Sequence, residues 1–108
     1  MTQNTGVNPR DVMSPRSSWH LIDVLYEAEH WSLAVGRWQE DGEWRPVLAQ
    51  RWNGRAGGKG NPVSRGFPTW FVLPDETYEL YLGSRYVPRD RQAFVRGILG
   101  LPNTGAAA

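Results

Sequence analysis

Basic and aromatic side chains are interleaved in the middle of the chain, from residue 44 to residue 74. This segment contains no Asp or Glu, and it carries five cationic residues: Arg45, Arg51, Arg55, Lys59 and Arg65. Cationic side chains neutralise phosphates, and an exposed aromatic ring stacks on a nucleobase for about 1–3 kcal/mol. The pattern therefore favours single-stranded nucleic acid bound by loop and strand residues 45–65, with Trp52 or Phe67 stacked on a base.

Two other interpretations of this basic segment stay open. Eleven of the twelve basic residues are Arg, whose planar guanidinium binds carboxylates and phosphates through paired hydrogen bonds. Another anionic ligand or an acidic protein partner would therefore also fit. The simplest interpretation is a solvated loop beside a buried aromatic core. The whole chain has a formal net charge of only +1, which excludes a protein that coats polyanions through its overall charge.

Tryptophan is unusually frequent, because six Trp fall between residues 19 and 70. Buried Trp would supply apolar area that so small a domain needs for its core. Trp and Arg are also enriched at protein–protein hot spots, so the aromatic surface could instead be a homodimer or partner interface. A third alternative is a small-molecule pocket that holds a cation or an apolar ligand. Its walls would be Trp31, Trp38, Trp44 and Trp70.

Residues suited to catalysis or metal binding are sparse. The chain has no Cys and only two histidines, so thiol nucleophiles and Cys-based zinc sites are excluded. We expect His20 to be a buried core residue on the apolar face of a strand. Glu27, Glu29 and His30 lie close together in the sequence, but carboxylates in a turn are usually solvated. We therefore expect a non-catalytic binding module with no catalytic residue, no metal and no cofactor.

Alternating hydrophobicity predicts strands at residues 20–28, 31–38 and 44–52. A helix over residues 20–28 is the alternative, because apolar residues there also recur at helical spacing. Asp41 and Gly42 predict a hairpin turn between the second and third strands, since both tolerate a positive φ. This turn would bring Trp38 and Trp44 nearly opposite one another. Pro46 lacks an N–H, so its strand is an edge strand or begins near it.

The second half of the chain predicts a loop, a strand and two helices. Residues 53–68 include five Gly and two Pro, which is typical of a loop. Residues 69–73 are nearly all apolar and predict a short central strand. Helices are predicted over residues 75–82 and 88–99, each followed by a Gly. The expected fold is α+β, a Trp-rich antiparallel sheet of three to four strands followed by two short helices.

We expect one domain at residues 18–99, between a flexible N-terminal arm (1–17) and a flexible C-terminal tail (100–108). Both ends are poor in apolar side chains and would gain little from packing. Residues 101–105 fit the sortase pattern LPxTG, which we take as coincidence or a remnant of engineering. No apolar stretch is long enough for a secretory signal or a membrane span, so we expect a cytoplasmic protein without membrane contact.

Overall fold

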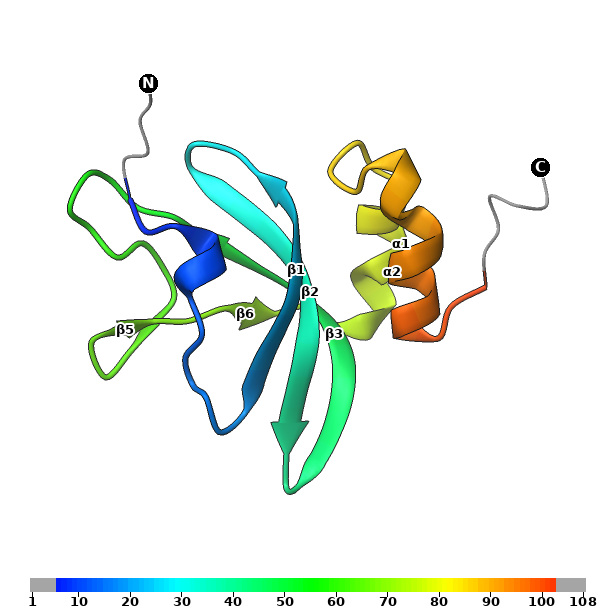
Figure 1. Cartoon of the computed structure of the whole chain (residues 1–108), viewed down its shortest axis with the longest axis horizontal. Helices are drawn as coiled ribbons and strands as arrows, with labels where there is room; N and C mark the ends of the chain where they lie inside the picture. The colour runs from blue at the N-terminus through cyan, green and yellow to red at the C-terminus, as the bar shows by residue number, and fades with distance from the viewer. Residues whose placement is uncertain (1–5, 103–108) are drawn as a thin grey trace.

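A computed structural model describes residues 6–102, in which an antiparallel sheet carries two helices against one face (Figure 1). The sheet has the strand order β1-β2-β3-β6, and β4 and β5 form a separate two-stranded ribbon. The strands are β1 (Trp19–Glu27), β2 (Trp31–Glu40), β3 (Glu43–Trp52), β4 (Val63–Ser64), β5 (Phe67–Pro68) and β6 (Phe71–Val72). The helical segments are η1 (Pro9–Asp11), η2 (Asp75–Thr77), α1 (Tyr78–Leu82), η3 (Arg89–Arg91) and α2 (Gln92–Leu99). The predicted α+β fold is confirmed.

The β2–β3 hairpin is the longest regular part of the sheet. Its turn is the predicted Asp41-Gly42, with φ of 56° and 83°. The pairing runs from Trp31 opposite Trp52 to Glu40 opposite Glu43 without a register shift. The expected pair of Trp38 and Trp44 is wrong by one position, because Trp38 lies opposite Arg45. A shift of one residue turns a side chain to the other face, so Trp38 and Trp44 lie on opposite faces.

Strand β1 confirms the predicted strand at residues 20–28, and the helical alternative is wrong. Two register shifts against β2 interrupt its alternation, so the neighbouring residues Val24 and Leu25 are both buried. The expectation for His20 is also wrong. Its ring is exposed and stacks on Trp44, with 4.5 Å between the ring centroids. His20 pairs with Arg37 near the turn end of the hairpin, outside both apolar clusters of the core.

The sheet separates two apolar clusters. On one face, α1 and α2 pack over Leu33, Val35 and Leu48. On the other face, the N-terminal segment and Trp70 pack over the sheet, where Ala34 belongs to the second cluster. Figure 1 shows the helices on one side of the strands and the blue N-terminal segment on the other. Residues 33–35 are therefore buried without alternation, because both faces of β2 are covered.

The N-terminal segment differs from the predicted flexible arm over residues 6–17. Val12 is only 1 % exposed, and Pro9 is buried beside it in η1. The Val7 N–H donates to the Asn53 carbonyl at 2.9 Å, and Trp70 Nε1 donates to the Val12 carbonyl at 2.9 Å. Few apolar residues are enough here because Pro9 and Val12 are enclosed and the backbone is hydrogen-bonded. The rest of the predicted arm, residues 1–5, lies outside the described residues.

The C-terminal end packs in the same way as far as residue 102. Gly100 ends α2 with a φ of 73°, as its predicted position after the helix requires. The Leu101 N–H donates to the Arg96 carbonyl at 2.9 Å, and the Leu101 side chain contacts the helix-side cluster. The predicted flexible tail is therefore wrong for residues 100–102. Residues 103–108, with most of the LPxTG pattern, lie outside the described part of the chain.

Strand β6 is an edge strand of two residues, which corrects the predicted central strand at residues 69–73. It pairs with β3 only at Ala49 and Gln50. Trp70 and Leu73 on either side of it are buried in opposite clusters, whereas Phe71 is 54 % exposed. The apolar run thus reflects contacts with both core clusters rather than a central place in the sheet.

No helix within residues 6–102 is long and apolar enough to cross a membrane.

Candidate functional site

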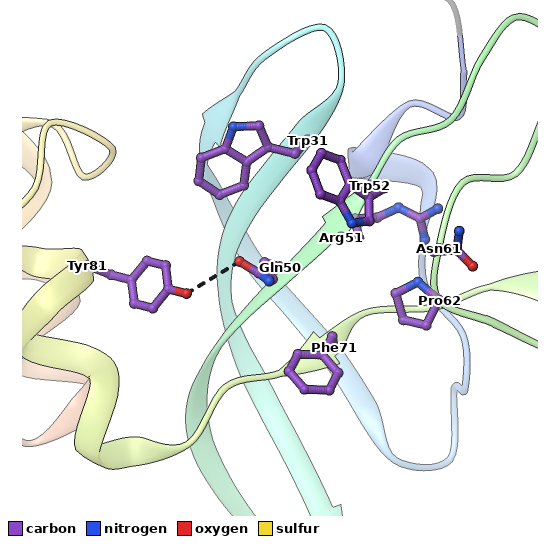
Figure 2. A pocket seen from close by; sticks show the side chains of 8 residues that line it. All are labelled: Trp31, Gln50, Arg51, Trp52, Asn61, Pro62, Phe71 and Tyr81. Atoms are coloured by element: carbon purple, nitrogen blue, oxygen red, sulfur yellow. Dashed lines mark hydrogen bonds between the residues drawn. The ribbon is translucent and has the colours of Figure 1, made fainter.

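A pocket of about 620 Å³ lies between the hairpin, β6, α1 and the Gly-rich loop, which we define as residues 53–62 (Figure 2). Four aromatic rings, two carboxamides, one Pro and one Arg line it: Trp31, Gln50, Arg51, Trp52, Asn61, Pro62, Phe71 and Tyr81. The volume falls within the range of about 300–1,000 Å³ that is usual for small-molecule sites. A largely aromatic lining with few polar groups is also typical of such sites.

Trp31 and Trp52 form one wall of the pocket. They are directly paired residues of β2 and β3, so their side chains lie on the same face of the sheet. Trp31 is held from behind by Tyr26 and Tyr86, with ring centroids 5.1 Å and 5.0 Å away. Trp52 is 60 % exposed. The wall therefore has one ring fixed by packing and one ring open to solvent.

Gln50 and Phe71 line the side of the pocket next to this wall. They are paired between β3 and β6, and Gln50 is also two residues from Trp52 on the same face. Tyr81 approaches from α1, and its hydroxyl donates to Gln50 Oε1 at 3.5 Å (Figure 2). The pocket thus holds the Gln50 carboxamide among aromatic rings that come from three strands and a helix.

The Gly-rich loop closes the remaining side through Asn61 and Pro62. Asn61 pairs with Trp52 through two backbone hydrogen bonds, of 2.8 Å and 3.0 Å between N and O. Gly60 has a φ of 67°, and an added Cβ would lie 1.9 Å from the Trp52 carbonyl oxygen. Only Gly allows the loop to approach the strand so closely. This close pairing holds Asn61 and Pro62 beside the pocket.

Arg51 fastens the same loop from inside the fold. Its guanidinium is part of a side chain that is 3 % exposed, and it donates to the Thr69 carbonyl at 2.5 Å and to the Lys59 carbonyl. Burial lowers the pKa of Arg51 to about 10, so the group stays charged at neutral pH. Within residues 6–102 it forms no ion pair. The structure therefore places Arg51 in a structural role, not on an exposed phosphate-binding surface.

The other predicted cationic residues do not form one surface with Arg51. Arg45 is exposed six residues away along β3, a separation of about 20 Å in an extended strand. Lys59 Nζ donates to the Gly66 carbonyl at 2.6 Å. Arg55 and Arg65 are exposed in turns on either side of Lys59. Within residues 6–102 the side chains of these last two form no hydrogen bond and no ion pair.

The predicted aromatic site residues are also distributed over several places. Trp52 lines the pocket, whereas Phe67 is exposed on β5 outside it. Of the four Trp expected to wall a pocket, only Trp31 does so. Trp38 lies on the opposite face, Trp44 stacks on His20, and Trp70 is buried against Trp19 with 5.9 Å between ring centroids. The structure does not bring these four rings together.

Sequence reasoning missed five lining residues: Gln50, Asn61, Pro62, Phe71 and Tyr81. Gln50 could have been found, because it alternates in phase with Leu48 and Trp52 and so shares their face. Nothing in the sequence places Tyr81 opposite Gln50, since the direction in which α1 crosses the sheet depends on tertiary packing.

Acidic and histidine side chains do not gather into a metal site in the described part of the chain. No group of three or more His, Asp or Glu is found there that could hold a metal ion. Glu27 forms an ion pair with Arg10, and His30 Nε2 lies 3.8 Å from Glu29 Oε1 on the surface.

Comparisons with protein-family models, with curated proteins and with solved structures find no match for the chain. Its function is therefore inferred from the geometry of the pocket.

Proposed function

We propose that this protein is a non-catalytic binding module that holds a planar ring in the aromatic pocket. The exposure of Trp52 and Phe71 at the pocket carries this proposal, since they are 60 % and 54 % exposed. Large apolar side chains gathered around a concave site are the usual mark of a ligand-binding surface. Trp19 and Trp70, in contrast, are buried and contribute to the hydrophobic core.

The lining favours a neutral ring over a cation. Aromatic cages that bind cations gain from the ring faces, and a nearby carboxylate adds to that attraction. No Asp or Glu lines this pocket. A cationic ligand would therefore find no counter-charge among the lining residues. A planar neutral ring would stack on Trp31 or Trp52 and fill the apolar space.

Ligand-observed NMR with a panel of planar and saturated rings tests this proposal. We expect indole, benzimidazole and uridine to bind, and cyclohexanol not to bind. Trp52→Ala removes the exposed wall and should weaken binding roughly 5- to 150-fold, the equivalent of about 1–3 kcal/mol of stacking. Trp44→Ala is the matched control, because Trp44 is an exposed Trp of the same strand outside the pocket. The absence of binding by every planar ring at millimolar concentration, or an equal loss in both variants, would overturn the proposal.

A single-stranded nucleic acid is the second candidate, with one base as the planar ring. Arg55 and Arg65 favour it, because both are exposed and lie in the segment that also supplies Asn61 and Pro62 to the pocket. A strand with a base in the pocket could place its phosphates along this segment.

Fluorescence polarisation of a labelled oligonucleotide at several salt concentrations separates this candidate from free-ring binding. For single strands the logarithmic salt slope is about −0.7 for each neutralised phosphate. The double variant Arg55→Ala/Arg65→Ala should therefore reduce the slope by about 1.4 and leave free-ring binding unchanged. Arg51 is kept in this test, since its removal would release the loop. An unchanged slope, or no oligonucleotide binding at low salt, would exclude this candidate.

A further inference from the structure

Gln50 is the one uncharged polar side chain that β3 directs to the pocket side of the sheet beside Trp52. It is paired with Leu33 on one side and with Phe71 on the other, so its carboxamide lies between the helix-covered core and the edge of the sheet. The side chain is half-buried. A ring stacked on Trp31 or Trp52 would have its edge near this carboxamide (Figure 2).

Tyr81 contacts that carboxamide from α1. Its hydroxyl donates to Gln50 Oε1 at 3.5 Å, which turns the oxygen toward α1. Figure 2 shows the Gln50 nitrogen on the side of Phe71. Within residues 6–102, Gln50 Nε2 forms no side-chain hydrogen bond, so both of its N–H donors remain for water or a ligand. Tyr81 is a positioning residue, because it acts on the ligand through Gln50.

We infer that Gln50 selects planar rings that present a neutral hydrogen-bond acceptor, a carbonyl oxygen or a ring nitrogen, at their edge. This inference rests on the proposed ring-binding function and names its ligand class. A ring without an acceptor would cover the Nε2 donors and leave them unpaired. A site built around a donor discriminates strongly against ligands that cannot pair with it. The pocket therefore prefers carbonyl-bearing or nitrogen-containing heterocycles to pure hydrocarbon rings.

Indole and benzimidazole test the inference, because they have nearly the same shape and differ by one acceptor nitrogen. We expect benzimidazole to bind the unmodified protein at least about fivefold more tightly than indole. Gln50→Glu replaces the donors with acceptor oxygens and should abolish or reverse that preference. Gln50→Leu should equalise the two affinities. Tyr81→Phe keeps the ring but releases the carboxamide, so the preference should shrink.

The outcomes separate the inference from the function on which it rests. Equal affinities of the two rings for the unmodified protein would overturn the inference and leave ring binding intact. A preference that persists unchanged in both Gln50→Glu and Tyr81→Phe would also overturn it, because another group would then read the acceptor. Failure of both rings and of the wider panel to bind would overturn the proposed function itself. Gln50→Glu and Tyr81→Phe keep the size of each side chain, so the test does not depend on Gln50→Leu folding.

Discussion

Trp31 and Trp52 face each other at the last pair of the β2–β3 ladder, and they differ sharply in exposure. Trp31 is packed against Tyr26 and Tyr86, whereas Trp52 projects into solvent with 60 % of its surface exposed. A planar ligand can therefore stack on Trp31, which is already held in place, or on Trp52, which is free to adjust. This combination lowers the ordering cost of binding at the fixed ring.

Replacement of Arg51 should release the Gly-rich loop. Arg51→Met removes the hydrogen bonds to the Thr69 and Lys59 carbonyls and leaves these acceptors without their partner. We expect the free energy of unfolding to fall by about 1–3 kcal/mol, measured by urea denaturation. Amide exchange of Asn61 should accelerate, because its hydrogen bond to Trp52 depends on the anchored loop.

Arg45→Met is the control for Arg51→Met, since Arg45 is exposed on the same strand. Its effect should stay within about 0.5 kcal/mol. An Arg51→Met variant as stable as the unmodified protein would mean that the cost of burying the charge exceeds the gain from its hydrogen bonds. The anchoring role of Arg51 would then be wrong.

Two Gly→Ala substitutions should change stability in opposite directions. A Cβ at Gly36 of β2 would lie 2.4 Å from Trp19 Cη2 and 2.6 Å from the His20 carbonyl oxygen. Gly36→Ala should therefore cost about 1–3 kcal/mol through overpacking. A Cβ at Gly97 of α2 would meet no atom within 4 Å, so Gly97→Ala should gain about 0.5–1 kcal/mol of helix propensity. Thermal unfolding measures both, and equal shifts of the same sign would contradict the packing of Trp19 against β2.

Stability at acidic pH should depend on the ion pair between Glu79 of α1 and Arg96 of α2. Arg96 donates two hydrogen bonds of 2.9 Å and 3.0 Å to the carboxylate, which hold the pKa of Glu79 below its usual value. An unfolded Glu titrates near pH 4.3, about the ordinary value. Because the folded pKa is lower, the ion pair stabilises the fold fully above about pH 4.3. This stabilisation is lost as the pH falls through the folded pKa of Glu79.

Glu79→Gln tests this pH dependence. The variant should be less stable at neutral pH, because the buried Arg96 loses its counter-charge. It should also lose less stability than the unmodified protein between pH 5 and pH 2. Denaturant unfolding across this range provides both curves, and parallel curves would show that Glu79 does not contribute to the acid transition.

Much of the fold follows from local signals in the sequence. Asp41-Gly42 predicts the hairpin because the turn itself requires positive φ at both residues, and the pattern before Gly100 predicts α2. The two register shifts of β1 could not be predicted, since they depend on how β1 and β2 pack on both faces. The order of the N-terminal segment depends on long-range contacts, among them the hydrogen bonds from Val7 to the Asn53 carbonyl and from Trp70 to the Val12 carbonyl.

The candidate site was less predictable than the fold. Composition drew attention to all six Trp, but it could not separate Trp31 and Trp52, which line the pocket, from Trp70, whose burial depends on tertiary contacts. Charge counting suggested Arg51 as a surface cation, although the side chain is enclosed by the loop that it holds. Gln50 and Tyr81 are 31 positions apart, and only the packing of α1 on the sheet brings them together.

The indole N–H signals of the six Trp test the central claim most directly. In a ¹H–¹⁵N correlation spectrum, assigned with single Trp→Phe variants, a titration with benzimidazole should shift the signals of Trp31 and Trp52 in a saturable way. The signal of Trp70, whose Nε1 is hydrogen-bonded to the Val12 carbonyl, should not move. Shifts confined to Trp44, or the absence of saturable shifts at Trp31 and Trp52, would contradict the aromatic pocket as the binding site.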